Sequence, residues 1–290
     1  MCPITAVQLE KRRAHLGSSD LAALINMDKR RNRYDLWLDK TGKLEPEKER
    51  DTQNDPKIAG KILEPAVLQW AELRLGALTC NQYRSAKDQG LPIGVNIDAI
   101  LNETGIPVEA KTSGLYGWTG DTWGAENSDE VPDHILIQTQ GHAIATKKDT
   151  CYVPVFIAFR GFAMFQVPRD IELSDYIGEQ AISFWEKNVL ADIPPEDITP
   201  HPGIVKRVRR EANKTVSLDQ GLVDTWQSFR DHRLAAEKEE KNALAAILAS
   251  IGDAEAGQAV TGLFTYLESN RAGYTVEPST FRTARFKRNK

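Results

Sequence analysis

The sequence predicts a fold of the α/β class, of the α+β type, in which helices flank a mixed central β-sheet and a mainly helical extension follows. Residues 94–113 form two arms of alternating apolar and other side chains around a turn at 102–105, the pattern of a β-hairpin. Residues 59–76 and 132–146 carry apolar side chains three and four positions apart, which indicates helices. The mostly apolar run at 151–159 is typical of a strand buried on both faces.

The elements before the hairpin are short. Residues 4–16 are predicted to be helical, and Gly17–Asp20, ahead of an apolar run, is typical of a capped helix start that can also bind phosphate. A helix is expected at 34–40, with Gly42 as its left-handed cap. Residues 78–84 read as a strand. The hairpin therefore has a neighbouring strand in the sheet.

The elements after the hairpin complete the first domain. Residues 113–131 show no period and are expected to be an irregular segment beside the site. A strand at 162–168 is predicted to pair with the apolar strand before it, and 175–189 to form a long amphipathic helix. The proline-rich stretch 190–203 then ends the domain.

The pattern changes beyond this point, so we divide the chain into a domain at 1–202 and an extension at 203–290. Residues 218–251 read as one long helix or a helical hairpin, of a kind that pairs with another helix or another subunit. Short strands are expected at 259–268 and 274–287, followed by a basic tail that we interpret as solvent-exposed.

The hairpin carries the chemistry. A turn centred between Glu103 and Thr104 sets Asp98 opposite Glu109, and the strand period of two puts Lys111 on the same face as Glu109. Two close carboxylates repel each other, and Mg²⁺, which takes carboxylate, water and phosphate oxygens, relieves that repulsion. The lysine could orient or deprotonate water, or stabilise charge on a phosphate. The cluster therefore predicts phosphodiester hydrolysis.

Composition excludes several other classes. Three cysteines cannot form a four-cysteine iron–sulfur site, and the five histidines show no zinc-hydrolase spacing. No apolar run approaches the roughly 20 residues that span a bilayer, so we expect a cytoplasmic protein without a membrane partner. The net charge of −4 does not exclude DNA, because a nuclease needs only a locally basic channel.

Asp98 followed by Glu109-Ala110-Lys111 resembles the D…(D/E)xK signature of the restriction-endonuclease-like nuclease superfamily. The flanking segments resemble, in order, the YqaJ-like viral recombinase family, relatives of phage lambda exonuclease. The matching stretches are Gly17–Gly42, Gly60–Leu75, Asp98–Lys111, Pro132–Thr146 and Ala158–Pro194. This resemblance implies a restriction-endonuclease-like core within residues 1–202.

The resemblance also implies roles for particular residues. The metal would be held by Asp98, Glu109 and Glu64, with the carbonyl of Ala110 or Val108 as an extra ligand. These three acids and Lys111 would be the catalytic residues.

A second implied set would bind the terminal 5′ phosphate of DNA. It comprises Arg12, with Arg13 as the alternative, Ser19 and Gln140, while Gln138 would line the site. The same set would distinguish an exonuclease from an endonuclease.

Taken as a whole, the resemblance implies an exonuclease dependent on Mg²⁺, with Mn²⁺ as a substitute, that digests linear double-stranded DNA from a free end in the 5′→3′ direction. The 3′ overhang would pass to a single-strand annealing protein, and relatives imply a homo-oligomer, a trimeric ring. If phage-encoded, the protein would act in the bacterial host cytoplasm. Two alternatives stay open, an endonuclease on the same scaffold and a non-catalytic DNA-binding recombination accessory protein.

Overall fold

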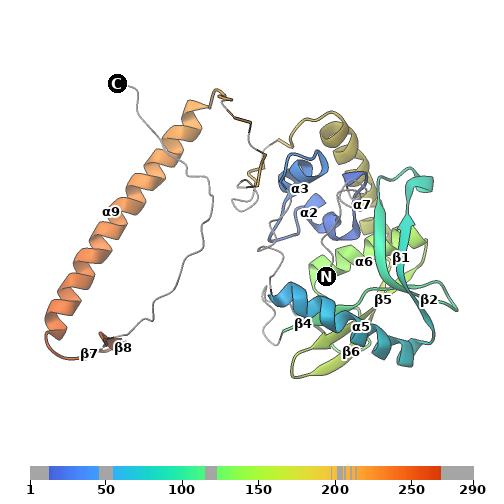
Figure 1. The fold of residues 1–290 in the computed structure, drawn as a ribbon, viewed down its shortest axis with the longest axis horizontal. Helices are drawn as coiled ribbons and strands as arrows, with labels where there is room; N and C mark the ends of the chain where they lie inside the picture. The colour runs from blue at the N-terminus through green and yellow to red at the C-terminus, as the bar shows by residue number, and fades with distance from the viewer. Residues whose placement is uncertain are drawn as a thin grey trace. The chain divides into compact units, whose positions relative to one another are not determined.

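The computed structural model describes residues 13–45, 55–114, 123–196 and 198–268, apart from 201–204, 206, 210 and 213. The chain divides into two compact units, Met1–Arg210 and Glu211–Lys290. Figure 1 shows the sheet with its helices in the first unit and one long helix in the second. Within the part of the chain that is described, no helix combines the length and the apolar character needed to cross a membrane.

The first unit is built on a six-stranded mixed sheet, which confirms the predicted fold class. β1 pairs with β2, β2 with β3 and β5 with β6 in antiparallel fashion, whereas β3 and β4 both run parallel to β5. The strands are β1 (Leu78–Ser85), β2 (Gly94–Leu101), β3 (Pro107–Val108), β4 (Lys111–Ser113), β5 (Thr150–Ile157) and β6 (Gly161–Pro168).

The hairpin has the predicted register, with Ala99 opposite Val108. Its second arm, however, leaves the ladder after Val108, because the amide of Glu109 donates to the carbonyl of Tyr152 at 2.9 Å. The next amide, that of Ala110, donates to Asp98 Oδ2 at 2.9 Å. The arm is therefore split into β3 and β4, and the break between them places Glu109 and Asp98 at the site.

The predicted helices are confirmed. They are α3 (Arg33–Lys40), α5 (Asp55–Leu75), α6 (Asp133–Thr146) and α7 (Ile171–Phe184), the last continued by the π-helical turn Trp185–Leu190. The capped start at Gly17–Asp20 is a 3₁₀ turn, η1 (Ser18–Asp20), that leads into the single-turn helix α2 (Leu21–Leu24); a second 3₁₀ turn, η2, spans Lys87–Gln89.

Two expectations about helix boundaries are wrong. The predicted helix 4–16 does not reach Leu16, whose amide and carbonyl bond instead to Pro92 and Gly94; residues 1–12 lie outside the described residues. The helix expected at 59–76 begins earlier, at Asp55, so Pro65 lies inside α5. Proline there lacks the amide that would bond one turn back, and the helix continues without that bond.

The core brings α6 close to η1. Leu21, Leu36, Ile93, Ile144 and Ile177 belong to one buried cluster that joins the N-terminal turns, the sheet and helices α6 and α7. A Cβ atom on Gly141 of α6 would lie 2.5 Å from Leu21 Cδ1 and 3.4 Å from Ser18 Cα. Only glycine therefore lets the helix approach this turn so closely.

The second unit contains α9 (Gln220–Ile251), a single helix rather than a helical hairpin, and a small antiparallel pair, β7 (Ala256–Ala259) and β8 (Gly262–Thr265). Asp219 caps α9 by accepting from the amide of Leu222 at 3.0 Å. The strand predicted at 259–268 is shorter and is preceded by β7, which was not predicted. The strand predicted at 274–287 lies outside the described residues.

Candidate active site

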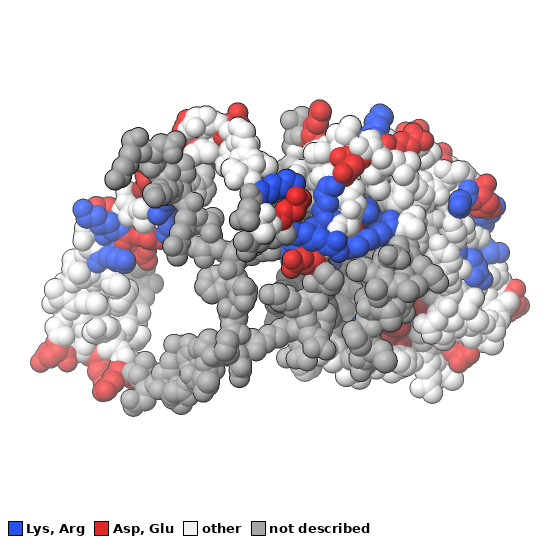
Figure 2. All heavy atoms as spheres, turned by 45° about the horizontal axis from the view of Figure 1, so that its top comes forward, with Lys and Arg blue, Asp and Glu red and all other residues white. Residues whose placement is uncertain are grey.

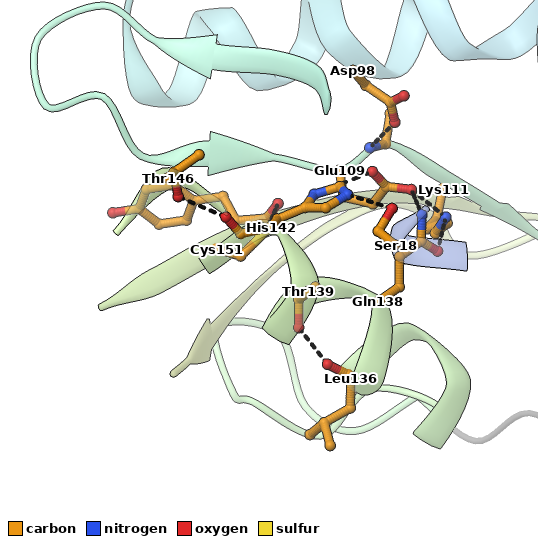
Figure 3. Close-up of polar contacts among 12 residues, drawn as sticks. Ser18, Asp98, Glu109, Lys111, Leu136, Gln138, Thr139, His142, Thr146 and Cys151 are labelled. Atoms are coloured by element: carbon orange, nitrogen blue, oxygen red, sulfur yellow. Dashed lines mark hydrogen bonds and ion pairs between the residues drawn. The ribbon is translucent and has the colours of Figure 1, made fainter. Parts of the chain in front are cut away.

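A pocket of about 140 Å³ lies where β2, α6 and the N-terminal turns meet. Its lining includes Ser18, Ser19, Lys40, Asp98, Glu109 and Gln138. Four segments, the N-terminal turn, α3, the hairpin and α6, therefore contribute polar side chains to one cavity. The hairpin acids and one of the two predicted glutamines face it together, and Figure 3 shows their arrangement.

Glu109 is the centre of the polar network. Its Oε1 atom accepts from Lys111 Nζ at 2.5 Å and from Gln138 Nε2 at 2.6 Å. Lys111 Nζ also donates to Gln138 Oε1 at 3.0 Å, which closes a triangle of three side chains (Figure 3). Burial would lower the pKa of Lys111, but Glu109 and Asp98 together hold that pKa above its usual value. The lysine is therefore an ammonium at neutral pH, held in a fixed direction.

Asp98 is the second acid of the pocket. Burial, followed by repulsion from Glu109 and Glu64, raises the pKa of Asp98 to about 8, against the opposing attraction of Lys111. Glu64, half-buried on α5, is thus near enough for its charge to act on Asp98. The three predicted acids and the lysine therefore belong to one electrostatic cluster.

The donor set suits a hard divalent cation. Among the residues that the structure describes, no three His, Cys, Asp or Glu side chains form a ready-made metal site. Mg²⁺, however, commonly takes only one or two carboxylates and fills its other positions with water and substrate oxygens. The raised pKa of Asp98 shows that the site disfavours a second negative charge, and a bound cation would remove that penalty. Asp98 and Glu109 therefore fit such an ion.

His142, which was not predicted, connects Glu109 to the N-terminal turn. The ring is fully buried, with Nε2 2.9 Å from Ser18 Oγ and Nδ1 3.6 Å from Glu109 Oε2. Burial lowers its pKa despite the nearby carboxylate, so the imidazole is neutral. The sequence contained a signal for it, because His142 follows Gln138 by four residues and so shares its helix face.

The turn that carries Ser18 and Ser19 is held by a buried acid. Asp20 accepts from the amide of Gly17 at 2.9 Å and forms ion pairs with Lys40 Nζ at 2.7 Å and Arg31 Nη1 at 3.2 Å. Burial alone would raise the pKa of Asp20, but the two cations lower it to about 2. The structure places the predicted Ser19 on the pocket wall, and Lys40 lines the same pocket.

Gln140, another predicted phosphate-binding residue, is not among the residues that line the pocket. Gln140 is 1% exposed, and its Oε1 accepts from the amide of Asp170 at 2.9 Å and from Ser174 Oγ at 3.4 Å. Its Nε2 donates to the carbonyl of Pro168 at 3.2 Å. Gln140 thus has its polar atoms bonded within the fold and does not line the pocket, and a phosphate-binding role for it stays a prediction. Two positions along a helix turn a side chain by about 200°, so only one of the two glutamines faces the pocket.

Arg12 lies outside the described residues. The alternative, Arg13, has its guanidinium beside Gly42 at the end of α3. It is absent from the pocket lining.

Comparison with known proteins finds a matching family and one similar curated protein. Residues 9–149 match the YqaJ-like viral recombinase domain family, which confirms the resemblance stated above. The Bacillus subtilis protein YqaJ, described as uncharacterized, is 27% identical over 190 residues, 64% of this chain and 57% of that protein. The chain thus spans little more than half of that relative.

Solved structures with some likeness include an alkaline exonuclease from Laribacter hongkongensis and a phage-related exonuclease from Haemophilus somnus. The first has 17% identity and a TM-score of 0.49, covering 65% of this chain and 94% of the exonuclease. The second has 16% identity and a TM-score of 0.40, covering 62% and 97%. At this distance, function has to be inferred from the side chains of the pocket.

Proposed function

We propose that this chain, which carries a YqaJ-like viral recombinase domain over residues 9–149, is a Mg²⁺-dependent deoxyribonuclease that digests linear duplex DNA from its ends. The observation that carries the proposal is that Asp98 and Glu109 line one pocket and that Lys111 bonds to Glu109. Carboxylates beside a fixed ammonium suit a phosphodiester, whose oxygens can bind both a cation and a hydrogen-bond donor.

Each residue of the cluster has a distinct role in this proposal. Asp98 and Glu109 hold Mg²⁺ or Mn²⁺, with Glu64 and the carbonyl of Ala110 completing its shell. When bound, the ion supplies Lewis-acid stabilisation of the charge that develops on the scissile phosphate. Lys111 donates to a phosphate oxygen or to the attacking water, because its ammonium is already directed into the site. Gln138 keeps Lys111 and Glu109 at a fixed separation.

A non-catalytic accessory protein is less consistent with the half-buried lysine beside the buried Glu109. A buried ion pair costs desolvation free energy and is often no more stable than an apolar substitute. Lys111 nevertheless lies among Glu109, Gln138 and Asp98. An ammonium beside two carboxylates favours catalysis.

End recognition would come from the N-terminal turn. Ser19 and Lys40 line the pocket beside the acids and could bind a terminal 5′ phosphate, as could Arg12. Figure 2 shows Lys and Arg side chains gathered on one face of the larger unit, as contact with a DNA backbone requires. The 5′→3′ direction, a single-strand annealing partner and a three-membered ring belong to the same proposal.

The test is digestion of a linear duplex labelled separately at its 5′ and 3′ ends, with a closed circular duplex alongside, in the presence and absence of Mg²⁺. We expect loss from 5′-phosphorylated ends and an untouched circle. Lys111→Ala should abolish cutting, while the exposed Lys87→Ala, which lies on η2, should not. Cutting of the circle would indicate an endonuclease, and unchanged cutting by Lys111→Ala would overturn the assignment of the site.

A further inference from the structure

α9 carries a long apolar stripe, and of the stripe residues only Ile251, at one end, is buried. Leu222 and Phe229 are each 71% exposed, and Trp226, Leu244 and Ile247 are each 40–44% exposed. At 100° per residue these five side chains fall on one face of the helix. Ile251, on the same face, is buried beside Gly257 of β7.

The stripe has a twofold pattern along the helix. From the midpoint between Ala236 and Glu237, apolar residues recur at equal distances in both directions. Phe229 corresponds to Leu244, Trp226 to Ile247, and Leu222 to Ile251. Arg233 and Glu240 are also at equal distances from this midpoint, and both lie on the face of the stripe.

We propose that α9 is a dimerisation helix that packs antiparallel against α9 of a second copy of this chain, a contact separate from the three-membered ring of the proposed function. Antiparallel pairing about the stripe's midpoint sets apolar side chains against apolar ones over most of the helix, which at 32 residues is about 48 Å long. A twofold axis makes each contact occur twice, because residue i of one copy meets residue j of the other and the reverse.

Charge complementarity selects a second copy in this orientation. In the antiparallel pair each Arg233 faces Glu240 of the second copy, on either side of the axis. In a parallel pair the same positions would place arginine against arginine and glutamate against glutamate, which repel. Arg233 already bonds to Glu237 one turn along its own helix, so its guanidinium is held near the axis.

Charge exchange in the full-length chain tests the pairing. Molecular mass would be measured by sedimentation equilibrium over a range of concentrations for the parent, Arg233→Glu, Glu240→Arg and the double variant. We expect each single variant to weaken the self-association constant at least tenfold, because like charges then face each other twice. The double variant should restore the parent's association, because the opposite charges are again paired.

Two exposed leucines supply a matched control. Leu244 lies on the stripe, whereas Leu234 lies about 100° away from its centre, and the two are 41% and 45% exposed. Leu244→Glu should weaken association and Leu234→Glu should not, with equal helix content by circular dichroism. A monomeric parent, equal effects of the two leucine variants, or a double charge variant that stays dissociated would overturn the proposal. Digestion of DNA by the dissociated variants would be assayed separately, since the cutting site lies in the other unit.

Discussion

The two glutamines of α6 allow a sharp test of how the site is assembled. Gln138 bonds to both Glu109 and Lys111, whereas Gln140 bonds to Pro168, Asp170 and Ser174 on the other side of the helix. Replacing each by leucine, which has a similar volume, removes its hydrogen bonds and leaves the helix otherwise intact. Gln138→Leu should therefore impair catalysis, and Gln140→Leu should impair stability.

The structure sets the size of each effect. Gln138 makes two bonds to ionised groups, each worth about 1.5–3 kcal/mol. If roughly half of that total holds Lys111 and Glu109 in the reactive geometry, kcat/KM falls about 10- to 100-fold, equivalent to about 1.5–3 kcal/mol. Gln140 makes three neutral bonds of about 1 kcal/mol each. Gln140→Leu should lower the free energy of unfolding by about 2–3 kcal/mol, or Tm by roughly 5–10 °C for a unit of this size.

Both variants would be assayed with an end-labelled linear duplex and by thermal unfolding. We expect Gln138→Leu to keep its Tm within about 3 °C of the parent, because its partners remain paired with each other. Gln140→Leu should retain kcat/KM per folded molecule below its transition. Normal stability with lost cutting in Gln140→Leu would mean that this residue contacts DNA after all, and the helix rotation described here would be wrong.

Three further outcomes are expected. The pKa of Asp20 is about 2 in the folded protein and 3.8 ordinarily. The ionised carboxylate therefore adds about 2 kcal/mol to the free energy of unfolding above about pH 4, and this contribution disappears as the pH falls toward 2. Urea unfolding at a series of pH values should show this loss of stability, and Asp20→Asn should remove the pH dependence. His142→Ala should lower kcat about tenfold with KM for DNA unchanged, since the ring contacts Glu109 and Ser18 rather than the pocket; an unchanged kcat would exclude a positioning role. Chelation of divalent cations should abolish cutting, and added Mg²⁺ should restore it. Asp98→Asn should raise the Mg²⁺ concentration needed for the half-maximal rate about tenfold. Equal Mg²⁺ dependence of the parent and the variant would exclude Asp98 as a ligand.

The hairpin could be predicted because its determinants are local. Alternation of side chains fixes which face Glu109 and Lys111 share, and the turn at 102–105 fixes the register, which the structure confirms at Ala99 and Val108. The split of the second arm could not be predicted. It depends on the carbonyl of Tyr152, which lies more than forty residues further along the chain.

The face of α6 was harder to predict because this helix is buried on most sides. Ile135, Ile137 and every residue from Thr139 to Ala145 are buried, so hydrophobic periodicity does not mark a single inward direction. Its rotation is set by the close approach of Gly141 to Leu21, a tertiary contact. For the same reason His142 escaped notice, since Ser18, its partner, lies 124 residues away.

The contacts of Glu109 explain why so many side chains surround one acid. Its Oε1 atom is held by Lys111 and Gln138, and its Oε2 atom lies toward His142, which is anchored on Ser18. A neutral imidazole neither withdraws the negative charge nor adds a competing positive one. The carboxylate is thus oriented by the protein alone, before a cation or DNA arrives. Such preorganisation lowers the cost of reaching the transition state, because few groups have to move during the reaction.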